Sequence, residues 1–197
     1  MELPEHPFWD FSLRVHGREG VGEACLALQR DFGLDVNLLF FCCWAGACRG
    51  EPLGRADVSA AVASVAGWQE EVVGPVWRAR WRLKGGFPGF PAERTEALRK
   101  ALIAAELDAE HAEQLRLAEA VPVEERPEAD DGARLAAAAA NLAACLAVCL
   151  PEGSPARAAR PPEALVDPLG TLLEGVFPGL EAGRIRSELL TALRSSG

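Results

Sequence analysis

The sequence lacks the patterns that predict β-strands and membrane-spanning helices. No stretch alternates β-branched and polar residues, as a half-buried strand would. A membrane-spanning helix needs about 20 consecutive apolar residues. The run from Leu38 to Trp44 has no polar residue, but it is much shorter than that. Residues 1–6 are polar and contain proline, so they do not resemble a secretory leader. We therefore expect an all-α protein located in the cytoplasm, with no membrane partner.

Positive charge is also scarce. The chain has 20 Lys and Arg residues against 29 Asp and Glu residues, which gives a net charge of −9 at pH 7. A surface of this sign repels nucleic acids and anionic membranes. We therefore expect no nucleic-acid partner.

Motifs that carry enzymatic chemistry are missing as well. The sequence contains no dinucleotide fingerprint, phosphate loop or nucleophile elbow. It has no Glu-x-x-His motif, which di-iron bundles require, and the acidic segment 106–113 is interpreted as a solvated charged face. These observations predict no catalytic residues, no metal and no cofactor, so an enzyme is not the expected class.

Six cysteines are present, and most lie in apolar helical runs where cysteine behaves as a small hydrophobic residue. Buried structural thiols in a reducing compartment are the main interpretation. A redox, nucleophilic or metal-binding role is the alternative. The cysteines are Cys25, Cys42, Cys43, Cys48, Cys145 and Cys149.

Apolar residues at steps of three and four predict helices along the whole chain. Between Val21 and Phe32 they form one stripe, and Gly33 follows at the position of a helix C-cap. Asp35 suits the N-cap of the next helix, 35–48, which is apolar nearly all the way round and should be buried. The other predicted helices are 7–15, one that follows Asp57, 68–84 with a kink at Gly74-Pro75, 92–119, 133–150, 163–175 and 181–194.

The proline-containing segments 121–132 and 151–163 predict linkers. We therefore expect a helical domain over residues 7–150, and a linker with a C-terminal helical extension over 151–197. The predicted architecture is a compact, multi-helix orthogonal bundle with helix 35–48 at its centre. Helix 92–119 should contact the core through the stripe Leu98, Leu102, Ala105 and Ala109.

Two sets of residues are candidates for binding. Arg78 and Arg82 share one face of helix 68–84, and Trp77 and Trp81 stack on another. Cations near a helix C-terminus are favoured by the helix dipole alone. An anion pocket, an acidic partner surface or a single-stranded nucleic-acid platform are the functional alternatives. Asn37 stands in the first turn of the apolar helix, where a buried amide must find partners.

These candidates support three hypotheses about function. The first is a nonenzymatic protein-interaction or adaptor module, and the second is a binder of, or an enzyme on, a small anionic metabolite. The second hypothesis places an inter-helix pocket among Trp9, Asn37, Cys42, Trp44 and Arg78. The third is self-association through the alanine-rich or C-terminal helices. The residues predicted to bind a ligand or partner are Asn37, Trp44, Trp77, Arg78, Trp81 and Arg82.

The N-terminal part of the chain also resembles a known family. The run FWDFSLRVHGREGVGEACLALQRDFGLDVNLLFFCCWAG resembles a bacterial family of conserved hypothetical proteins, a domain of unknown function. The resemblance rests on Trp9 and Phe11, Gly20-Val21, Cys25 to Gln29, Asp35 to Asn37, and Trp44. The segment VWRARWRLK at 76–84 adds to it, and the similarity extends over about residues 7–150. The resemblance implies family membership and no activity.

Overall fold

The computed structural model describes residues 3–154 and 161–195, and these residues contain helices and no strand. The expected all-α bundle is confirmed. In chain order the helices are α1 (Pro7–His16), α2 (Val21–Phe32), α3 (Val36–Arg49), α4 (Arg55–Trp68), α5 (Gly74–Arg82), α6 (Ala92–Ala120), α7 (Asp131–Cys149), α8 (Glu163–Val176) and α9 (Ala182–Ser195). A π-helical turn, η1 (Gln69–Val73), joins α4 to α5.

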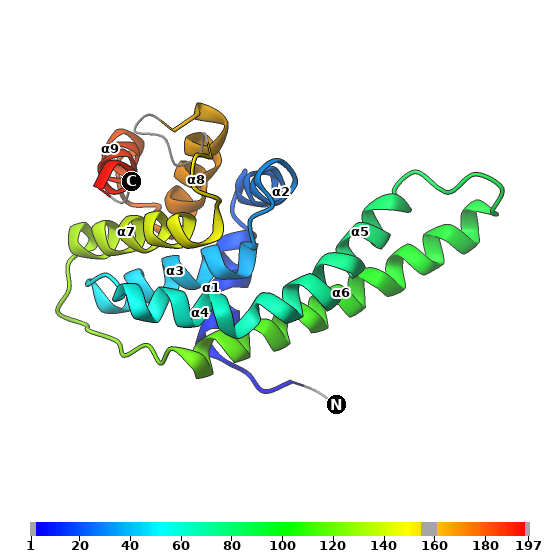
Figure 1. Ribbon diagram of the computed structural model, residues 1–197, viewed down its shortest axis with the longest axis horizontal. Coiled ribbons are helices and arrows are strands. Elements are labelled where there is room, and N and C mark those ends of the chain that lie inside the picture. The colour runs from blue at the N-terminus through cyan, green and yellow to red at the C-terminus, as the bar shows by residue number, and fades with distance from the viewer. Residues whose placement is uncertain (1–2, 155–160, 196–197) are drawn as a thin grey trace.

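Helix α3 forms the centre of the bundle, as its apolar sequence predicts. Asp35 caps it by accepting hydrogen bonds from the backbone N–H groups of Asn37 (2.8 Å) and Leu38 (3.3 Å). Every residue from Asn37 to Gly46 is buried. The helix lies directly against α7 (Figure 1), and a Cβ atom at Gly46 would lie 2.3 Å from the backbone nitrogen of Ala138. Glycine and alanine therefore permit an unusually close approach of these two helices.

Helix α7 is the one helix in the described part of the chain that is long and apolar enough to cross a membrane. Half of its most apolar window is buried inside the protein, where α7 packs between α3 and α9. A core helix of a bundle has the same composition, so length and hydropathy do not distinguish the two.

The C-terminal helices pack onto the same core. Helix α8 lies against α2, and α9 lies against α7 (Figure 1). Leu165, Leu169 and Ile185 are completely buried in a cluster shared with α3 and α7. The segment expected as an extension, 151–197, therefore completes the bundle in its helical part. Of the linker expected at 151–163, residues 155–160 lie outside the described residues.

Helices α4, η1 and α5 form one continuous rod that runs antiparallel to α6 and projects from the bundle as a long hairpin (Figure 1). At Gly74-Pro75, where a kink or restart is expected, α5 begins directly after the π turn. There the N–H of Gly74 donates to the carbonyl of Gln69, five residues back. This wider turn carries the helix past a proline that has no N–H to donate.

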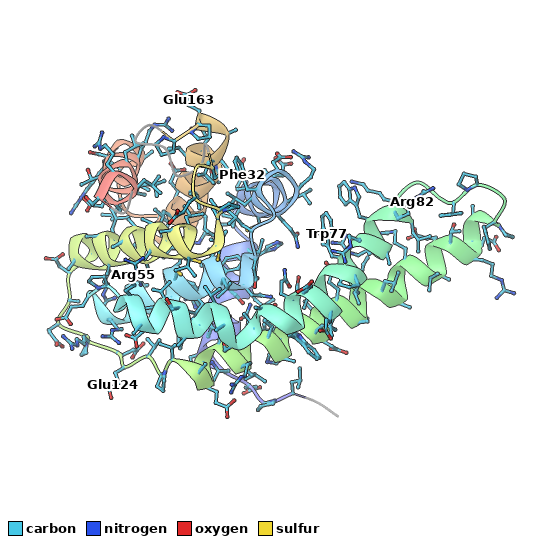
Figure 2. The ribbon with its side chains drawn as sticks, in the orientation of Figure 1. Phe32, Arg55, Trp77, Arg82, Glu124 and Glu163 are labelled. Atoms are coloured by element: carbon cyan, nitrogen blue, oxygen red, sulfur yellow. The ribbon has the colours of Figure 1, made fainter. Side chains whose placement is uncertain are left out.

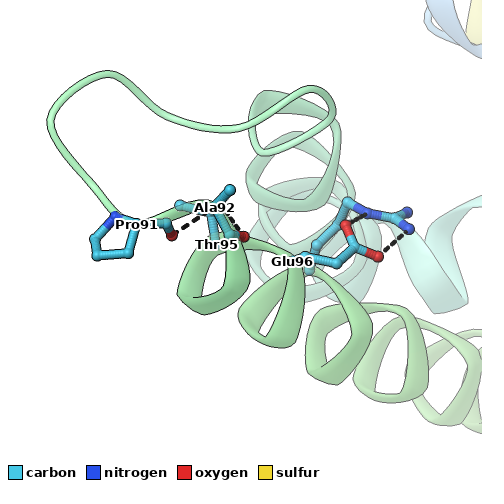
Figure 3. A network of polar contacts seen from close by, with 5 residues as sticks. Pro91, Ala92, Thr95 and Glu96 are labelled. Carbon is cyan, nitrogen blue, oxygen red and sulfur yellow. Dashed lines mark hydrogen bonds and ion pairs between the residues drawn. The ribbon is translucent and has the colours of Figure 1, made fainter.

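Close to the tip of the hairpin, local contacts fix the start of α6 (Figure 3). The hydroxyl of Thr95 donates to the carbonyl of Ala92 at 2.9 Å, and Glu96 accepts two hydrogen bonds of 2.8 Å from Arg99. This end of α6 has only α5 beside it. For that reason most of the predicted core stripe of this helix is wrong: Leu98 is 53% exposed and Ala105 is exposed, whereas Ala109 is buried as predicted. The buried face of α6 is Thr95, Glu106, Ala109, Glu113, Gln114 and Leu117.

The cysteines are free thiols, as expected. Cys25, Cys42, Cys43 and Cys145 are buried, Cys48 is half-buried and Cys149 is exposed. Burial raises the pKa of the Cys25 thiol to about 12, so this group stays neutral. The sulfur atoms of Cys145 and Cys149 lie 3.8 Å apart on one face of α7. No group of three or more His, Cys, Asp or Glu side chains in residues 3–154 and 161–195 is arranged to hold a metal ion.

Candidate functional site

A pocket of about 500 Å³ lies where the base of the hairpin meets the bundle. Its wall is built by α1, α2, α3, α5 and α6. The aromatic part of the wall comes from three different helices and consists of Trp9, Phe40, Trp77 and Trp81. Trp77 rises from α5 on the side that faces α2 (Figure 2). A pocket of this size can hold a small organic molecule.

The tryptophan rings on the pocket wall are held by other rings. Trp9 stacks on His111 of α6 with ring centres 4.3 Å apart and an angle of 8° between the planes. Trp77 and Trp81 stack on each other, one turn apart on α5, at 5.8 Å and 5°. These contacts reduce the number of rotamers available to each ring, so the aromatic surfaces are organised before any ligand arrives.

A chain of buried amides and hydroxyls closes the floor of the pocket. Ser12 of α1 donates to the side-chain oxygen of Gln114 of α6 at 3.0 Å. The amide nitrogen of Gln114 donates to the side-chain oxygen of Asn37 at 2.8 Å, and Asn37 donates to Glu113 at 2.7 Å. Residues almost 80 positions apart are thereby joined, and each amide is satisfied on both its oxygen and its nitrogen.

Behind this floor, two carboxyl groups share one buried environment. Asp35 Oδ2 and Glu113 Oε1 have no hydrogen-bond donor when both groups are ionised. Burial is the largest cause that raises both pKa values, and the nearby charge of Asp35 helps to raise the pKa of Glu113 to about 9. The backbone N–H groups that Asp35 caps favour its ionised form. At neutral pH we therefore assign a proton to Glu113, which hydrogen-bonds to the Asp35 carboxylate.

Another carboxylate on α6, Glu106, has its charge balanced by an ion pair with an arginine. Arg80 of α5 approaches it with two nitrogen atoms, Nε to Oε2 and Nη2 to Oε1, the latter at 2.9 Å. Glu106 is 6% exposed, so this ion pair is largely shielded from solvent. The other cation of the wall, Lys84, has its Nζ atom 4.5 Å from the centre of the Trp81 ring. Both positive groups of the wall are thus already engaged with protein groups.

The remaining acidic group of the wall, Glu110, is different. Within the described residues it forms no hydrogen bond and no ion pair. Burial raises the pKa of Glu110 to about 7, and the charge of Glu106 adds to this effect, whereas Arg80 lowers it. Glu110 therefore changes its charge near neutral pH, and it does so on the wall of the pocket.

The structure brings some of the predicted binding residues together and separates others. Asn37, Trp77 and Trp81 line the pocket. Trp44 does not, because it is buried in the core with its ring stacked 5.0 Å from that of Phe8.

The two arginines predicted to bind are exposed on the hairpin. Arg78 and Arg82 lie on the outer surface of α5, and Arg82 covers the ring of Phe87 at 4.3 Å. Neither of them lines the pocket. Cys42, which the second hypothesis placed in the pocket, is buried in the core of α3.

The sequence interpretation missed the acidic wall. Segment 106–113 was expected to be a solvated face, yet Glu106 and Glu113 are buried. A signal exists in the spacing: Glu106, Ala109, Glu113 and Leu117 recur at steps of three and four. Because such a stripe mixes charged and apolar residues, its burial becomes apparent only once the partners on α3 and α5 are known.

Comparison with known proteins places the pocket within a family. A family model described as "Protein of unknown function (DUF2390)" matches residues 7–117, more than half of the chain. The chain belongs to the DUF2390 family. The pocket wall, from Trp9 to Gln114, falls entirely inside the DUF2390 match, whereas α7, α8 and α9 follow it. Comparisons with curated proteins and with solved structures gave no significant match.

Proposed function

We propose that this protein is a nonenzymatic module that binds a small organic molecule in the pocket between α1, α2, α3, α5 and α6. The observation that carries the proposal is a pocket of about 500 Å³ whose aromatic rings and polar groups are held in place by protein contacts. Ligand sites in proteins are typically concave, mostly apolar and provided with a few fixed polar groups.

The polar groups of the wall support recognition more than catalysis. The single O–H of Ser12 is shared between the side-chain oxygen of Gln114 and the carbonyl of Trp9, neither of which is a base, so the hydroxyl is not activated. Among the described lining residues, no nucleophile is hydrogen-bonded to a histidine or a carboxylate. The free thiols are in keeping with the reducing cytoplasm that we propose as its location.

Filling the pocket tests the proposal. Gly22 of α2 lies on the wall, and a Cβ atom there meets its nearest neighbour, His16, at an ordinary 3.4 Å. We expect Gly22→Phe to occupy the pocket without breaking α2. A panel of aromatic fragments, read by saturation-transfer NMR, should bind the wild type and lose binding in this variant.

The matched control is Gly183→Phe on α9, where a Cβ atom would have no neighbour within 4 Å. It should bind fragments as the wild type does. Fragments that bind Gly22→Phe and the wild type equally would show that the pocket is not the site. A panel that gives no binder at all would overturn the proposal.

A second candidate function, a protein-interaction module, is supported by the projecting hairpin. Its exposed apolar side chains include Phe90 (65% exposed), Leu98 (53%) and Ile103 (40%). Exposed apolar groups gathered on one projection are typical of a surface that contacts another protein or a second copy.

Recovery of a partner in a pull-down, or of a dimer by sedimentation velocity, should fall in the double variant Phe90→Ser, Leu98→Ser. Val148→Ser on α7, at a position 38% exposed, is the control. Equal recovery with both variants would exclude the hairpin as the contact surface.

A further inference from the structure

We infer that the ligand of the pocket is a small aromatic or apolar molecule carrying a protonated amine, with its amine on the Glu110 carboxylate and its apolar body against Trp9, Trp77 and Trp81. The inference rests on the proposed binding function and specifies the charge of the ligand. It differs from the anionic metabolite of the second hypothesis in the sequence analysis, and the reasons lie in the pairing of charges around the pocket.

The half-buried positive group of the wall, Arg80, is not available to an anion. Arg80 directs two nitrogen atoms at Glu106, and that carboxylate would be left buried without a partner if Arg80 turned to a ligand. A buried charge that loses its partner is costly. Lys84 is exposed and lies over Trp81. An anionic ligand would therefore have to break existing contacts or settle for a solvated lysine.

The unpaired group on the wall is an acid. Glu110 has no hydrogen bond or ion pair in the described residues, and further carboxyl groups surround it. Glu106 lies one turn away on α6, and the charge of Asp35 also reaches it. These like charges destabilise the ionised form of Glu110. A cation beside Glu110 would relieve this repulsion, whereas an anion would increase it.

The aromatic residues fit the same ligand. The rings of Trp9, Trp77 and Trp81 line the pocket together with Glu110. The faces of tryptophan rings attract organic cations, and they provide apolar area for the body of such a ligand. One free carboxylate beside several rings is typical of a site for an organic amine. A metal site would need additional ligands, and none is grouped here among the described residues.

Three probes with the same ring test the charge: 2-phenylethylamine, phenylacetamide and phenylacetate, titrated into the full chain by calorimetry. We expect the wild type to bind the amine at least about tenfold more tightly than the amide or the acid. In Glu110→Gln the preference for the amine should disappear. The control is Asp108→Asn, an exposed carboxylate on the same helix and outside the pocket, which should leave the preference unchanged.

The pH dependence provides a second measurement that needs no variant. Ionised Glu110 binds the amine, so affinity should fall as the pH drops from about 8 to about 6 through the pKa of about 7. Titratable and charged groups from several elements face Glu110 or lie close to it. They are Glu106, Glu113 and His111 on α6, Asp35 before α3, Arg80 on α5, Lys84 in the turn after α5, His16 on α1 and Cys25 on α2. Affinity that is unchanged over this range would contradict the role of Glu110.

The outcomes separate the two proposals. Equal or tighter binding of the acid or the amide by the wild type would overturn the assignment of an amine and leave the pocket as a binding site. Amine binding that is equally tight in Glu110→Gln would also overturn the assignment of an amine. If none of the three probes bound and the fragment panel gave no binder, both the assignment of an amine and the proposed binding function would be overturned.

Discussion

Helix α3 contacts α7 and α6 in two different ways, and a buried asparagine marks each interface. Asn141 of α7 is fully buried and fully satisfied: it accepts from the N–H of Leu53 at 2.7 Å and donates to the carbonyl of Cys42 at 3.1 Å. Asn37 of α3 instead belongs to a network that includes Gln114 and ends at the carboxyl pair of Glu113 and Asp35, which needs a shared proton to satisfy its oxygens.

The difference shows what each interface does. Asn141 finds both of its hydrogen-bond partners in the backbone of the same core, so this interface serves stability. Around Asn37 the polar groups line a pocket and hold titratable acids at raised pKa values. Such perturbed groups are more often found at functional sites. Three predictions test the comparison.

The largest effect should come from the interface between α3 and α7. Gly46→Ala places a Cβ atom 2.3 Å from the nitrogen and 2.5 Å from the Cα of Ala138, so the backbones of α3 and α7 must separate. We expect a loss of about 3 kcal/mol in the free energy of unfolding, measured by urea denaturation. Gly67→Ala on α4, where the new Cβ has no neighbour within 4 Å, should stabilise by up to about 1 kcal/mol. Equal behaviour of the two variants would refute the close contact.

Replacing each of the two asparagines should have an intermediate effect on stability, and the size of the loss should differ between them. Asn141→Leu leaves the N–H of Leu53 without its partner in a dry core and removes the second hydrogen bond to the carbonyl of Cys42, and we expect a loss of about 2 kcal/mol. Asn37→Leu should cost less, about 1 kcal/mol, because Gln114, one of the two groups that it leaves behind, lines the pocket, where water can reach it. Thermal and urea unfolding of both variants measure the difference. A greater loss at Asn37 would reverse the comparison.

The smallest expected effect is an increase in the free energy of unfolding, in the variant Glu113→Gln. Because the pKa of Glu113 is raised to about 9, the folded protein holds a proton that the unfolded chain releases, and stability falls as the pH rises towards 9. In Glu113→Gln the amide can donate to Asp35 and accept from Asn37. We expect a gain of about 1 kcal/mol near pH 8, little gain near pH 5, and a shallower dependence of stability on pH.

Asp108→Asn, on the exposed side of α6, is the control for this gain and should leave the pH dependence unchanged. A steeper slope in Glu113→Gln, or an equal slope in both variants, would argue against the shared proton. Part of the slope should remain in either case, because the pKa of Glu110 is also raised.

Much of the fold follows from local sequence patterns. The caps at Asp35 and Gly33, and the wholly apolar segment from Leu38 to Trp44, were sufficient to place α2 and α3 and to predict which helix is buried. The projecting hairpin was not predictable, because the Gly74-Pro75 pair indicated a kink or a new helix, whereas the π turn before it lets α4 continue into α5 as one rod. The candidate site was predicted only in part: Asn37, Trp77 and Trp81 line the pocket, whereas Trp44, Arg78 and Arg82 lie elsewhere.

The sequence by itself determined the helices and the helix that lies at the centre, because helix periodicity, caps and an apolar run act over a few neighbouring residues. Only the tertiary structure decided which faces of α6 are buried and which acids hold a proton. Those properties depend on contacts between residues far apart in the chain, such as Asn37 with Glu113 and Arg80 with Glu106. Desolvation acts on a carboxyl group only when another helix removes its water, and no local pattern specifies that neighbour.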